Sequence, residues 1–184
     1  MSPIGDSGEQ FVSVDFENLV SSYYRALYQF AYSLTRSESD ACDLTQQTFY
    51  VWATKGHQLR DVTKVKSWLF TTLHREFLES RRRHNRFPHF EISQVDSELP
   101  AIAPARINQL DSEQVVQALE QVDEVYRAPV ALFYLESCSY KEIAEILDVP
   151  MGTVKSRIAR GVAQLQKLLT ESDTSGPRRK ESCG

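Results

Sequence analysis

The sequence is poor in glycine and cysteine and has no long hydrophobic run. Its 184 residues include only 7 glycines and 3 cysteines. Cys42, Cys138 and Cys183 are odd in number and lack the spacing of metal ligands, so we expect reduced thiols in a cytoplasmic protein. No apolar stretch approaches the roughly 20 residues of a membrane helix, so membrane insertion is not expected. Residues 1–10 lack the apolar part of a signal peptide, so export is not expected either.

Catalytic motifs are also missing from the sequence. The four histidines, His57, His74, His84 and His89, show no metal-ligand spacing such as His-Glu-x-x-His. No phosphate-binding glycine loop and no nucleophile elbow occurs. The sequence therefore predicts no catalytic residue, no cofactor and no metal site. A nucleic-acid-processing enzyme that uses these histidines is the alternative.

Charge is distributed unevenly along the chain. The net charge of −4 argues against nucleic-acid binding, but residues 60–86 hold eight Lys or Arg against three acidic residues. Residues 91–125 hold one basic residue against eight acidic ones. Binding depends on the local patch that faces the phosphates, so the total charge does not exclude DNA. Aromatic residues interleave with the basic ones, which suits contact with unstacked bases.

Hydrophobic residues recur at helical spacing almost throughout, and strand-like alternation is nearly absent. A hydrophobic fraction of 41% and a charged fraction of 25% are typical of a soluble globular protein. We expect an all-α fold with two small helical domains joined by a flexible linker. The expected divisions are a loose leader at 1–14, a first domain at 15–90, a linker at 91–110, a second domain at 111–170 and a polar tail at 171–184.

The periodicity also places individual helices. The predicted helices before the linker are 16–34, 40–54 and 67–84, with a loop or short turn at 55–66, and those after it begin with 111–122 and 123–137. Pro129 is expected to kink or delay the last of these. Pro100, Pro104 and the absence of a helical period make 91–110 better suited to connect two domains than to lie within one.

Residues 139–169 form the most informative segment. Ser139 followed by Glu142 is a capping box, which starts a helix. Asp148 tolerates the left-handed conformation that ends a helix, and Pro150 suits the first turn of the next. The buried positions expected in the second helix are Val154, Ile158, Val162 and Leu165. Two helices joined by a sharp turn are the arrangement with which many proteins enter the DNA major groove.

The opposite face of that second helix is basic, because residues 151–167 include four basic residues and no acidic one. The groove-facing candidates are Thr153, Lys155, Ser156, Arg157 and Arg160. We expect Lys155, Ser156 and Arg160 at bases, Thr153 at phosphate and Arg157 partly at the backbone. The alternatives are a solvated basic helix in an ordinary bundle and, for Arg157, an intramolecular ion pair.

These residues resemble bacterial sigma factors of the extracytoplasmic-function (ECF) group of the sigma-70 family. The resemblance is carried by SYKEIAEIL (139–147), GTVKSRIARG (152–161), DACDLTQQTFYVWA (40–53) and WLFTTLHREFLESRRRHNR (68–86). It covers roughly 16–87 and 111–169, and it implies sigma region 2 followed by sigma region 4. Such a protein directs core RNA polymerase to promoter DNA, assists strand opening, has no active site and is bound by an anti-sigma factor. A helix-turn-helix regulator that acts without polymerase is the alternative, although it would not need the helix at 40–53.

The resemblance also assigns roles in the first domain. The exposed polar face of 40–53 would bind polymerase through Asp43, Gln46, Gln47 and Tyr50, where an ordinary amphipathic helix is the alternative. The loop 57–65 would hold a flipped base of the −10 element, and the helix after it would contact that element's duplex. The candidates for these two tasks are His57, Arg60, Lys64, Lys66, Trp68, Arg75, Glu79, Arg82, Arg83 and Arg86.

The first domain departs from the family pattern at three residues. Arg75 and Glu79 occupy positions where the family usually has Asn and Asp, so the −10 sequence preference does not carry over. Cys42 stands where an acidic residue is common. Burial in the core is the alternative for Trp68, and a solvated helix end is the alternative for the arginines at 81–83.

Overall fold

A computed structural model describes residues 15–84 and 112–174 of the chain. These residues form α-helices and two short 3-10 turns, and no strand occurs among them, which confirms the all-α prediction. The elements are α1 (Phe16–Thr35), α2 (Glu38–Lys55), η1 (Gly56–Gln58), η2 (Val62–Lys64), α3 (Val65–His84), α4 (Ser112–Leu119), α5 (Glu124–Tyr134), α6 (Tyr140–Leu147) and α7 (Met151–Thr174). No helix in these two stretches is long and apolar enough to cross a bilayer.

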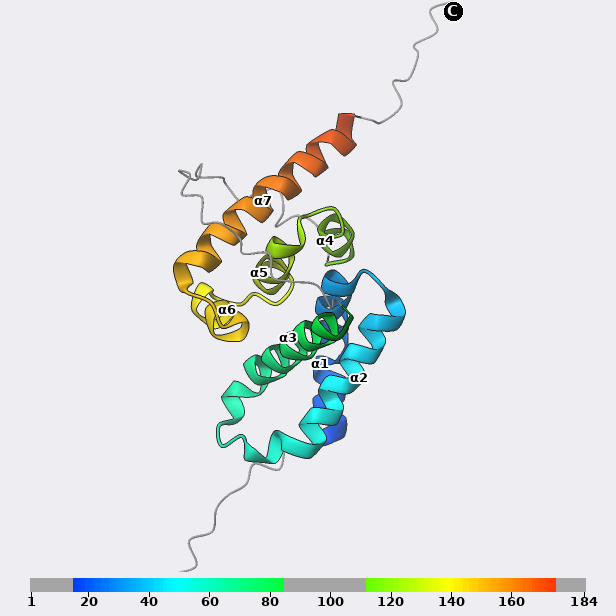
Figure 1. Ribbon diagram of the computed structural model, residues 1–184, viewed down its shortest axis with the longest axis vertical. Coiled ribbons are helices and arrows are strands. Elements are labelled where there is room, and N and C mark those ends of the chain that lie inside the picture. The colour runs from blue at the N-terminus through cyan, green and yellow to red at the C-terminus, as the bar shows by residue number, and fades with distance from the viewer. Residues whose placement is uncertain (1–14, 85–111, 175–184) are drawn as a thin grey trace, which may run out of the picture.

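Helices α1 to α3 pack into one bundle (Figure 1). Local sequence sets the boundary between the first two, because Arg36 ends α1 in the left-handed conformation and Ser37 accepts a hydrogen bond from the Asp40 N–H at 3.4 Å. Large side chains fill the space between the helices, and Phe30 lies 5.4 Å from Phe70 between ring centroids, both fully buried. The predicted loop at 55–66 contains η1 and η2.

Helices α4 to α7 form the second bundle. Its core contains Leu119, Leu132, Ile143 and Val154, each fully buried. Helix α5 begins at Glu124, so the expected delay of this helix by Pro129 is wrong. Pro129 is buried in the middle of the helix, where tertiary packing offsets the hydrogen bond that proline cannot donate.

The end of α5 also differs from the prediction. The helix stops at Tyr134, because Ser137 adopts a left-handed conformation (φ 54°) and the Cys138 N–H turns back to the Leu132 carbonyl at 3.0 Å. At the other end of this bundle, α7 continues to Thr174, so residues 171–174 are helical where a tail was predicted. The predicted leader at 1–14, the linker at 91–110 and the remainder of the tail lie outside the described residues.

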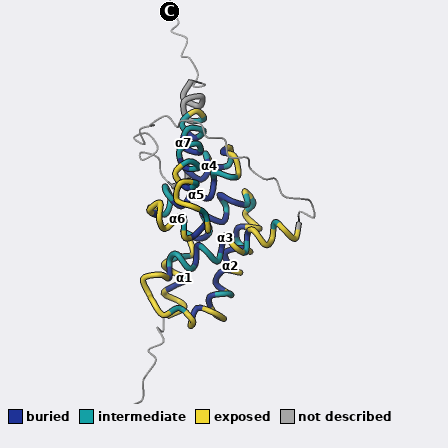
Figure 2. The backbone as a smooth tube through the Cα atoms, turned by 60° about the vertical axis from the view of Figure 1, so that its left-hand side comes forward, coloured by how far each residue is buried: buried dark blue, intermediate teal, exposed yellow. Residues whose placement is uncertain are grey.

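The two bundles are in contact with each other. Helix α1 packs against α4 and α5, and α3 packs against α6. Their buried side chains form one continuous hydrophobic core. Figures 1 and 2 show the bundles side by side, with the connection between α2 and α3 exposed at the end away from the second bundle. The sequence predicted two domains, but it did not predict that they would pack together.

Candidate DNA and polymerase interfaces

The helix-turn-helix has the local geometry that the sequence predicted. The Glu142 N–H donates to Ser139 Oγ at 3.3 Å, and the Ser139 N–H donates to Glu142 Oε2 at 2.7 Å. The Ser139 hydroxyl also donates to Glu142 Oε2 at 2.7 Å, and this bond, together with that from the Ser139 N–H, lowers the pKa of Glu142. Asp148 ends α6 in the left-handed conformation (φ 54°, ψ 50°), and α7 begins directly after Pro150. The capping box and the turn are therefore confirmed.

Helix α7 buries the predicted apolar face. Val154, Ile158, Val162 and Leu165 are all at most 6% exposed. Lys155 is exposed on the other face, while Thr153, Ser156, Arg157 and Arg160 are half-buried. The Ser156 hydroxyl donates to the Thr153 carbonyl at 3.0 Å, which restricts its rotation. The basic face is thus presented by a helix fixed on its other side.

Gly161 allows α7 to approach α5 closely. A Cβ atom at this position would lie 2.5 Å from Val130 Cγ2 and 3.0 Å from Tyr126 Cβ, closer than van der Waals contact permits. Gly152 in the first turn of α7 has open space around it. The sequence analysis did not identify this role, although a glycine inside a helical pattern is a signal for close packing.

The alternative for Arg157 was an intramolecular ion pair. In the part of the chain that the structure describes, Arg157 forms no such pair. Its half-buried guanidinium lies near His74 of α3, and burial lowers the pKa of Arg157. Burial, together with the neighbouring Arg157 charge, lowers the pKa of His74 to about 4. A candidate of the second domain is therefore close enough to the basic helix of the first for its charge to act on His74.

The loop before α3 is exposed. His57, Arg60 and Lys64 are exposed there, together with the apolar Val62 at 50% exposure. Asp61 accepts hydrogen bonds from the Thr63 backbone N–H (3.0 Å) and hydroxyl (2.6 Å), and these bonds lower the pKa of Asp61. The carboxylate thus fixes the turn that presents the surrounding polar and apolar groups.

Trp68 is half-buried rather than wholly in the core. Its ring meets Trp52 edge-on, with 5.1 Å between centroids. Gly56 lies under the Trp52 ring, and a Cβ there would come within 2.6 Å of it. The indole of Trp68 is therefore held by α2 at the edge of the exposed loop.

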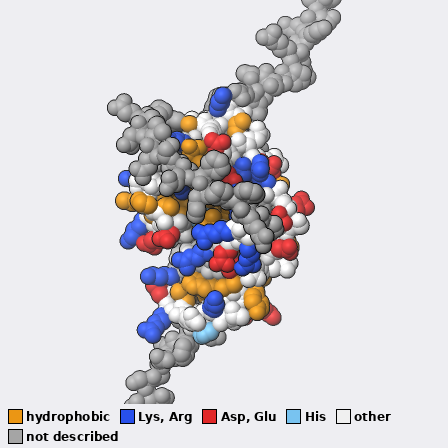
Figure 3. Space-filling view, in the orientation of Figure 1, with side chains coloured by type: hydrophobic (Ala, Val, Ile, Leu, Met, Phe, Trp, Pro, Cys, Tyr) orange, Lys and Arg blue, Asp and Glu red, His pale blue; other side chains and the backbone are white. Residues whose placement is uncertain are grey.

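The rest of α3 divides into two groups of candidates. Arg75, Glu79, Arg82 and Arg83 are exposed, and Arg83 forms an ion pair of 3.4 Å with Glu79 one turn earlier. Figure 3 shows Lys and Arg side chains gathered across the middle of the visible face, with acidic groups beside them. Lys66 is different, because its ammonium binds Glu136 of the second bundle. Arg86 lies outside the described residues.

The polymerase candidates share one exposed face of α2. Asp43, Gln46, Gln47 and Tyr50 are all exposed, and Tyr50 reaches 65%. The Gln46 amide donates to Cys42 Sγ at 3.2 Å, so the departure at Cys42 keeps a polar contact on this face. Helix α2 thus exposes the four candidates and buries its apolar residues, an arrangement that an ordinary amphipathic helix shares.

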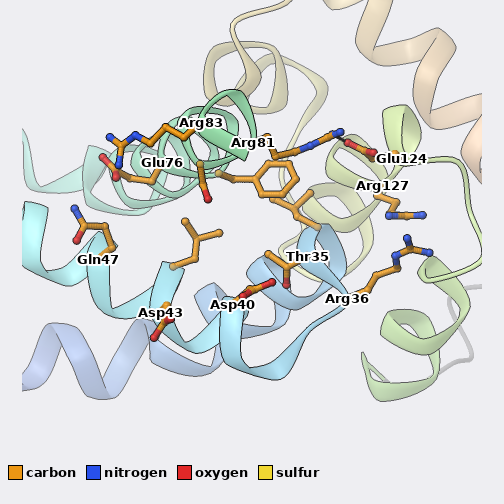
Figure 4. A pocket seen from close by; sticks show the side chains of 14 residues that line it. Thr35, Arg36, Asp40, Asp43, Gln47, Glu76, Arg81, Arg83, Glu124 and Arg127 are labelled. Atoms are coloured by element: carbon orange, nitrogen blue, oxygen red, sulfur yellow. Dashed lines mark ion pairs between the residues drawn. The ribbon is translucent and has the colours of Figure 1, made fainter. Parts of the chain in front are cut away.

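Two of these candidates also line a cavity between the bundles. Asp43 and Gln47 stand on one wall of this space of about 760 Å³, and Glu124 and Arg127 of α5 stand on another (Figure 4). Arg127 is only 7% exposed and donates to the Val122 carbonyl at 2.8 Å. Burial lowers the pKa of Arg127. The candidate polymerase face therefore borders the second domain.

The geometry of the two bundles defines a class of protein. One bundle presents a basic helix beside an exposed loop with a tryptophan at its edge, and the other presents a helix-turn-helix with a basic second helix. Among the described residues, no group of three or more His, Cys, Asp or Glu side chains could hold a metal ion. The class is a DNA-binding protein with two separate recognition elements.

Comparison with known proteins agrees with this class. Residues 19–87 match the family model for Sigma-70 region 2, and residues 112–165 match that for Sigma-70, region 4. The chain is 30% identical over 176 residues to the RNA polymerase sigma factor NccH of Alcaligenes xylosoxydans xylosoxydans, covering 90% of each. It is also 30% identical over 175 residues to the ECF RNA polymerase sigma factor SigE of Mycolicibacterium smegmatis, covering 90% of this chain but 65% of that relative.

A solved structure gives the same result. The sigma factor RpoE of Bartonella quintana, crystallised with the anti-sigma factor NepR, is 31% identical, with a TM-score of 0.66 over 85% of this chain and 97% of that one. The chain belongs to the ECF group of sigma-70 family sigma factors.

Proposed function

We propose that this protein directs core RNA polymerase to a set of promoters and assists strand opening there, while the polymerase performs the chemistry. The observation that carries the proposal is the basic face of α7, on which Lys155 is exposed and Arg157 and Arg160 are half-buried, in the second helix of a helix-turn-helix. Family membership adds the polymerase, and it does not favour a regulator that acts without one. The protein itself contributes no catalytic residue and acts in the cytoplasm.

Region 4 binds the −35 element in this proposal. Lys155 and Arg160 contact base edges, because long basic side chains can reach guanine in the major groove. Ser156 contacts a base, and Thr153 contacts a phosphate near the start of the helix. Arg157 lies partly at the DNA backbone. Support comes from the exposure of Lys155 and from the burial of the opposite helix face.

Region 2 binds the −10 element. The exposed loop with His57, Arg60 and Lys64 takes up an unstacked base beside Trp68, since an aromatic ring and nearby cations suit a single-stranded nucleotide. The helix that follows contacts the duplex. Its contributing side chains in this proposal are Lys66, Arg75, Glu79, Arg82, Arg83 and Arg86.

Region 2 also binds polymerase, through Asp43, Gln46, Gln47 and Tyr50. This assignment is supported by the exposure of all four side chains on one side of α2, while the apolar residues of that helix are buried on the other side. We also infer an anti-sigma factor as a partner, since the similar RpoE of Bartonella quintana was crystallised with one.

Run-off transcription with purified core polymerase on a promoter library tests the function. The protein should produce transcripts that share −35 and −10 sequences, and Asp43→Arg should reduce both transcription and core binding. Glu17→Arg, a charge reversal at an exposed site on α1, is the matched control and should leave both unchanged. Specific DNA binding with no affinity for core polymerase would instead identify a polymerase-independent regulator. A nuclease assay with metal analysis tests the enzyme alternative.

A further inference from the structure

One end of the cavity between the bundles holds an excess of positive charge. The cavity volume of about 760 Å³ lies within the range of small-molecule sites. Three of the arginines that line it gather at the end beside α5, and they are Arg36, Arg81 and Arg127 (Figure 4). Arg81 forms an ion pair with Glu124. Arg36 and Arg127 form no ion pair with a carboxylate of the described residues.

These two guanidinium groups converge on one uncharged oxygen. Arg36 Nη1 donates to the Glu120 carbonyl at 3.4 Å, and Arg127 Nη2 donates to the same oxygen at 3.5 Å. Both distances are long for a hydrogen bond, so both bonds are weak. No hydrogen bond between described residues uses Nη2 of Arg36 or Nη1 of Arg127, so these nitrogens remain able to donate.

The carboxylates nearest to this carbonyl in the sequence bind other groups. Glu120 Oε1 accepts a hydrogen bond from the Tyr32 hydroxyl at 2.9 Å, and Asp123 Oδ2 accepts one from the Gln164 amide at 2.7 Å. Arg127 is only 7% exposed. Burial lowers the pKa of Arg127, and the nearby charge of Arg36 lowers it further. Two like charges therefore lie close together, and one of them is buried.

Local structure fixes both arginines in this position. Arg36 ends α1 in the left-handed conformation (φ 56°, ψ 28°), where glycine is the usual residue, and its backbone N–H donates to the Tyr32 carbonyl at 2.8 Å. Arg127 is held from the other bundle, because its Nε donates to the Val122 carbonyl at 2.8 Å. The two cations thus come from two elements with ordered backbones.

We propose that the arginine end of this cavity binds a phosphate group, either as free phosphate or as the phosphate of a small organic ester. Guanidinium groups bind phosphate through paired N–H donors, and these charge-assisted bonds are stronger than bonds to a neutral carbonyl. A phosphate dianion would balance the charges of Arg36 and Arg127. Asp43 and Glu76 line the other end of the cavity, where they suit a donor group of an ester, such as an ammonium.

Isothermal titration calorimetry of the full-length protein tests the site with two probes, inorganic phosphate and O-phosphoethanolamine. Sodium chloride keeps the ionic strength constant, because general attraction to a charged surface is screened by salt. One phosphate should bind per protein with a dissociation constant of about 1 mM, a modest affinity that suits so small a ligand. Neither Arg36 nor Arg127 is a DNA candidate, so neither DNA nor polymerase is needed in the assay.

Arg36→Gln should weaken the binding of both probes about tenfold, because it removes one charged hydrogen-bond donor. Arg25→Gln is the matched control, since it makes the same change at an exposed position of α1 that does not line the cavity. This control should leave the affinity unchanged. Arg127→Lys keeps the charge but loses the planar fork, so a loss of about threefold is expected. Circular dichroism checks that each variant folds, and either arginine variant tests the site if the other does not.

The two probes distinguish the source of the phosphate. Tighter binding of O-phosphoethanolamine would identify a small ester as the ligand, and tighter binding of inorganic phosphate would identify the free anion. Failure of both probes to bind at about 20 mM, well above the expected dissociation constant, would overturn the site. Equal affinities of Arg36→Gln and Arg25→Gln would also overturn it, because phosphate would then bind elsewhere on the positive surface. Neither of these failures affects run-off transcription, which tests the sigma function separately.

Discussion

Replacing Gly161 by alanine should destabilise the protein, although alanine is the better helix former. An alanine in an exposed helix interior gains about 1 kcal/mol over glycine. At Gly161, however, the new methyl group would lie 2.5 Å from Val130 Cγ2 and 3.0 Å from Tyr126 Cβ. Carbon atoms prefer about 3.5–4.0 Å, so α7 must move away from α5 by about 1 Å or Val130 must repack. Val130 is fully buried and has little room to move.

Overpacking of this kind costs about 1–3 kcal/mol, and the gain in helix propensity offsets part of it. We expect Gly161→Ala to lower the free energy of unfolding by about 1–2 kcal/mol. Gly152→Ala is the matched control in the same helix, because no atom lies within 4 Å of its added Cβ. That variant should gain about 0.5–1 kcal/mol.

Urea denaturation followed by circular dichroism measures both changes. The two variants should differ in sign, and Val130→Ala should cost less in the Gly161→Ala background than in the wild type, because the smaller side chain removes the clash. A Gly161→Ala protein as stable as Gly152→Ala would refute the argument that close packing fixes α7 on α5.

Four further substitutions test other parts of the structure. Lys155→Ala and Arg160→Ala should each cost about 1–3 kcal/mol of specific −35 binding if they read bases, whereas an equal loss on all DNA sequences would indicate phosphate contacts. Because the pKa of His74 is lowered to about 4 in the folded protein, the unfolded chain takes up the proton first as the pH falls below about 6.5. His74→Gln should therefore flatten the loss of stability in urea denaturation between about pH 6.5 and 4, and an unchanged pH profile would contradict this. Ser139→Ala removes the capping box and should cost about 1 kcal/mol in thermal unfolding, whereas Ser22→Ala, at an exposed site within α1, should cost none, and an equal loss in both would contradict the role of the cap.

The features that the sequence predicted well are local ones. The capping box at Ser139, the left-handed Asp148 and the buried stripe from Val154 to Leu165 depend on residues within one or two helical turns. Their signals are therefore complete in a short stretch of sequence. The exposed face of α2 and the exposure of Lys155 on α7 follow from the same periodicity. Most candidate side chains consequently lie at the surface as expected.

The features that the sequence did not reveal depend on distant residues. Lys66 and Glu136 are 70 positions apart, and nothing near either one identifies the other. Pro129 suggested a disturbed helix by a local rule, but burial of that face of α5 overrode the rule. Tyr32 likewise donates a hydrogen bond to Glu120, 88 positions away, and no residue near either one indicates this contact.

The unevenly distributed charges of the chain serve both the proposed contact with DNA and ion pairing inside the folded protein. The excess of basic residues at 60–86 was interpreted as a site for DNA phosphates, and the acidic excess at 91–125 had no assigned role. In the folded protein, Arg81 from the basic segment pairs with Glu124 from the acidic one. Part of the positive charge of α3 is thus paired with an acidic group of the second bundle, so the number of basic residues at 60–86 is larger than the number of cations left for the proposed contact with DNA phosphates.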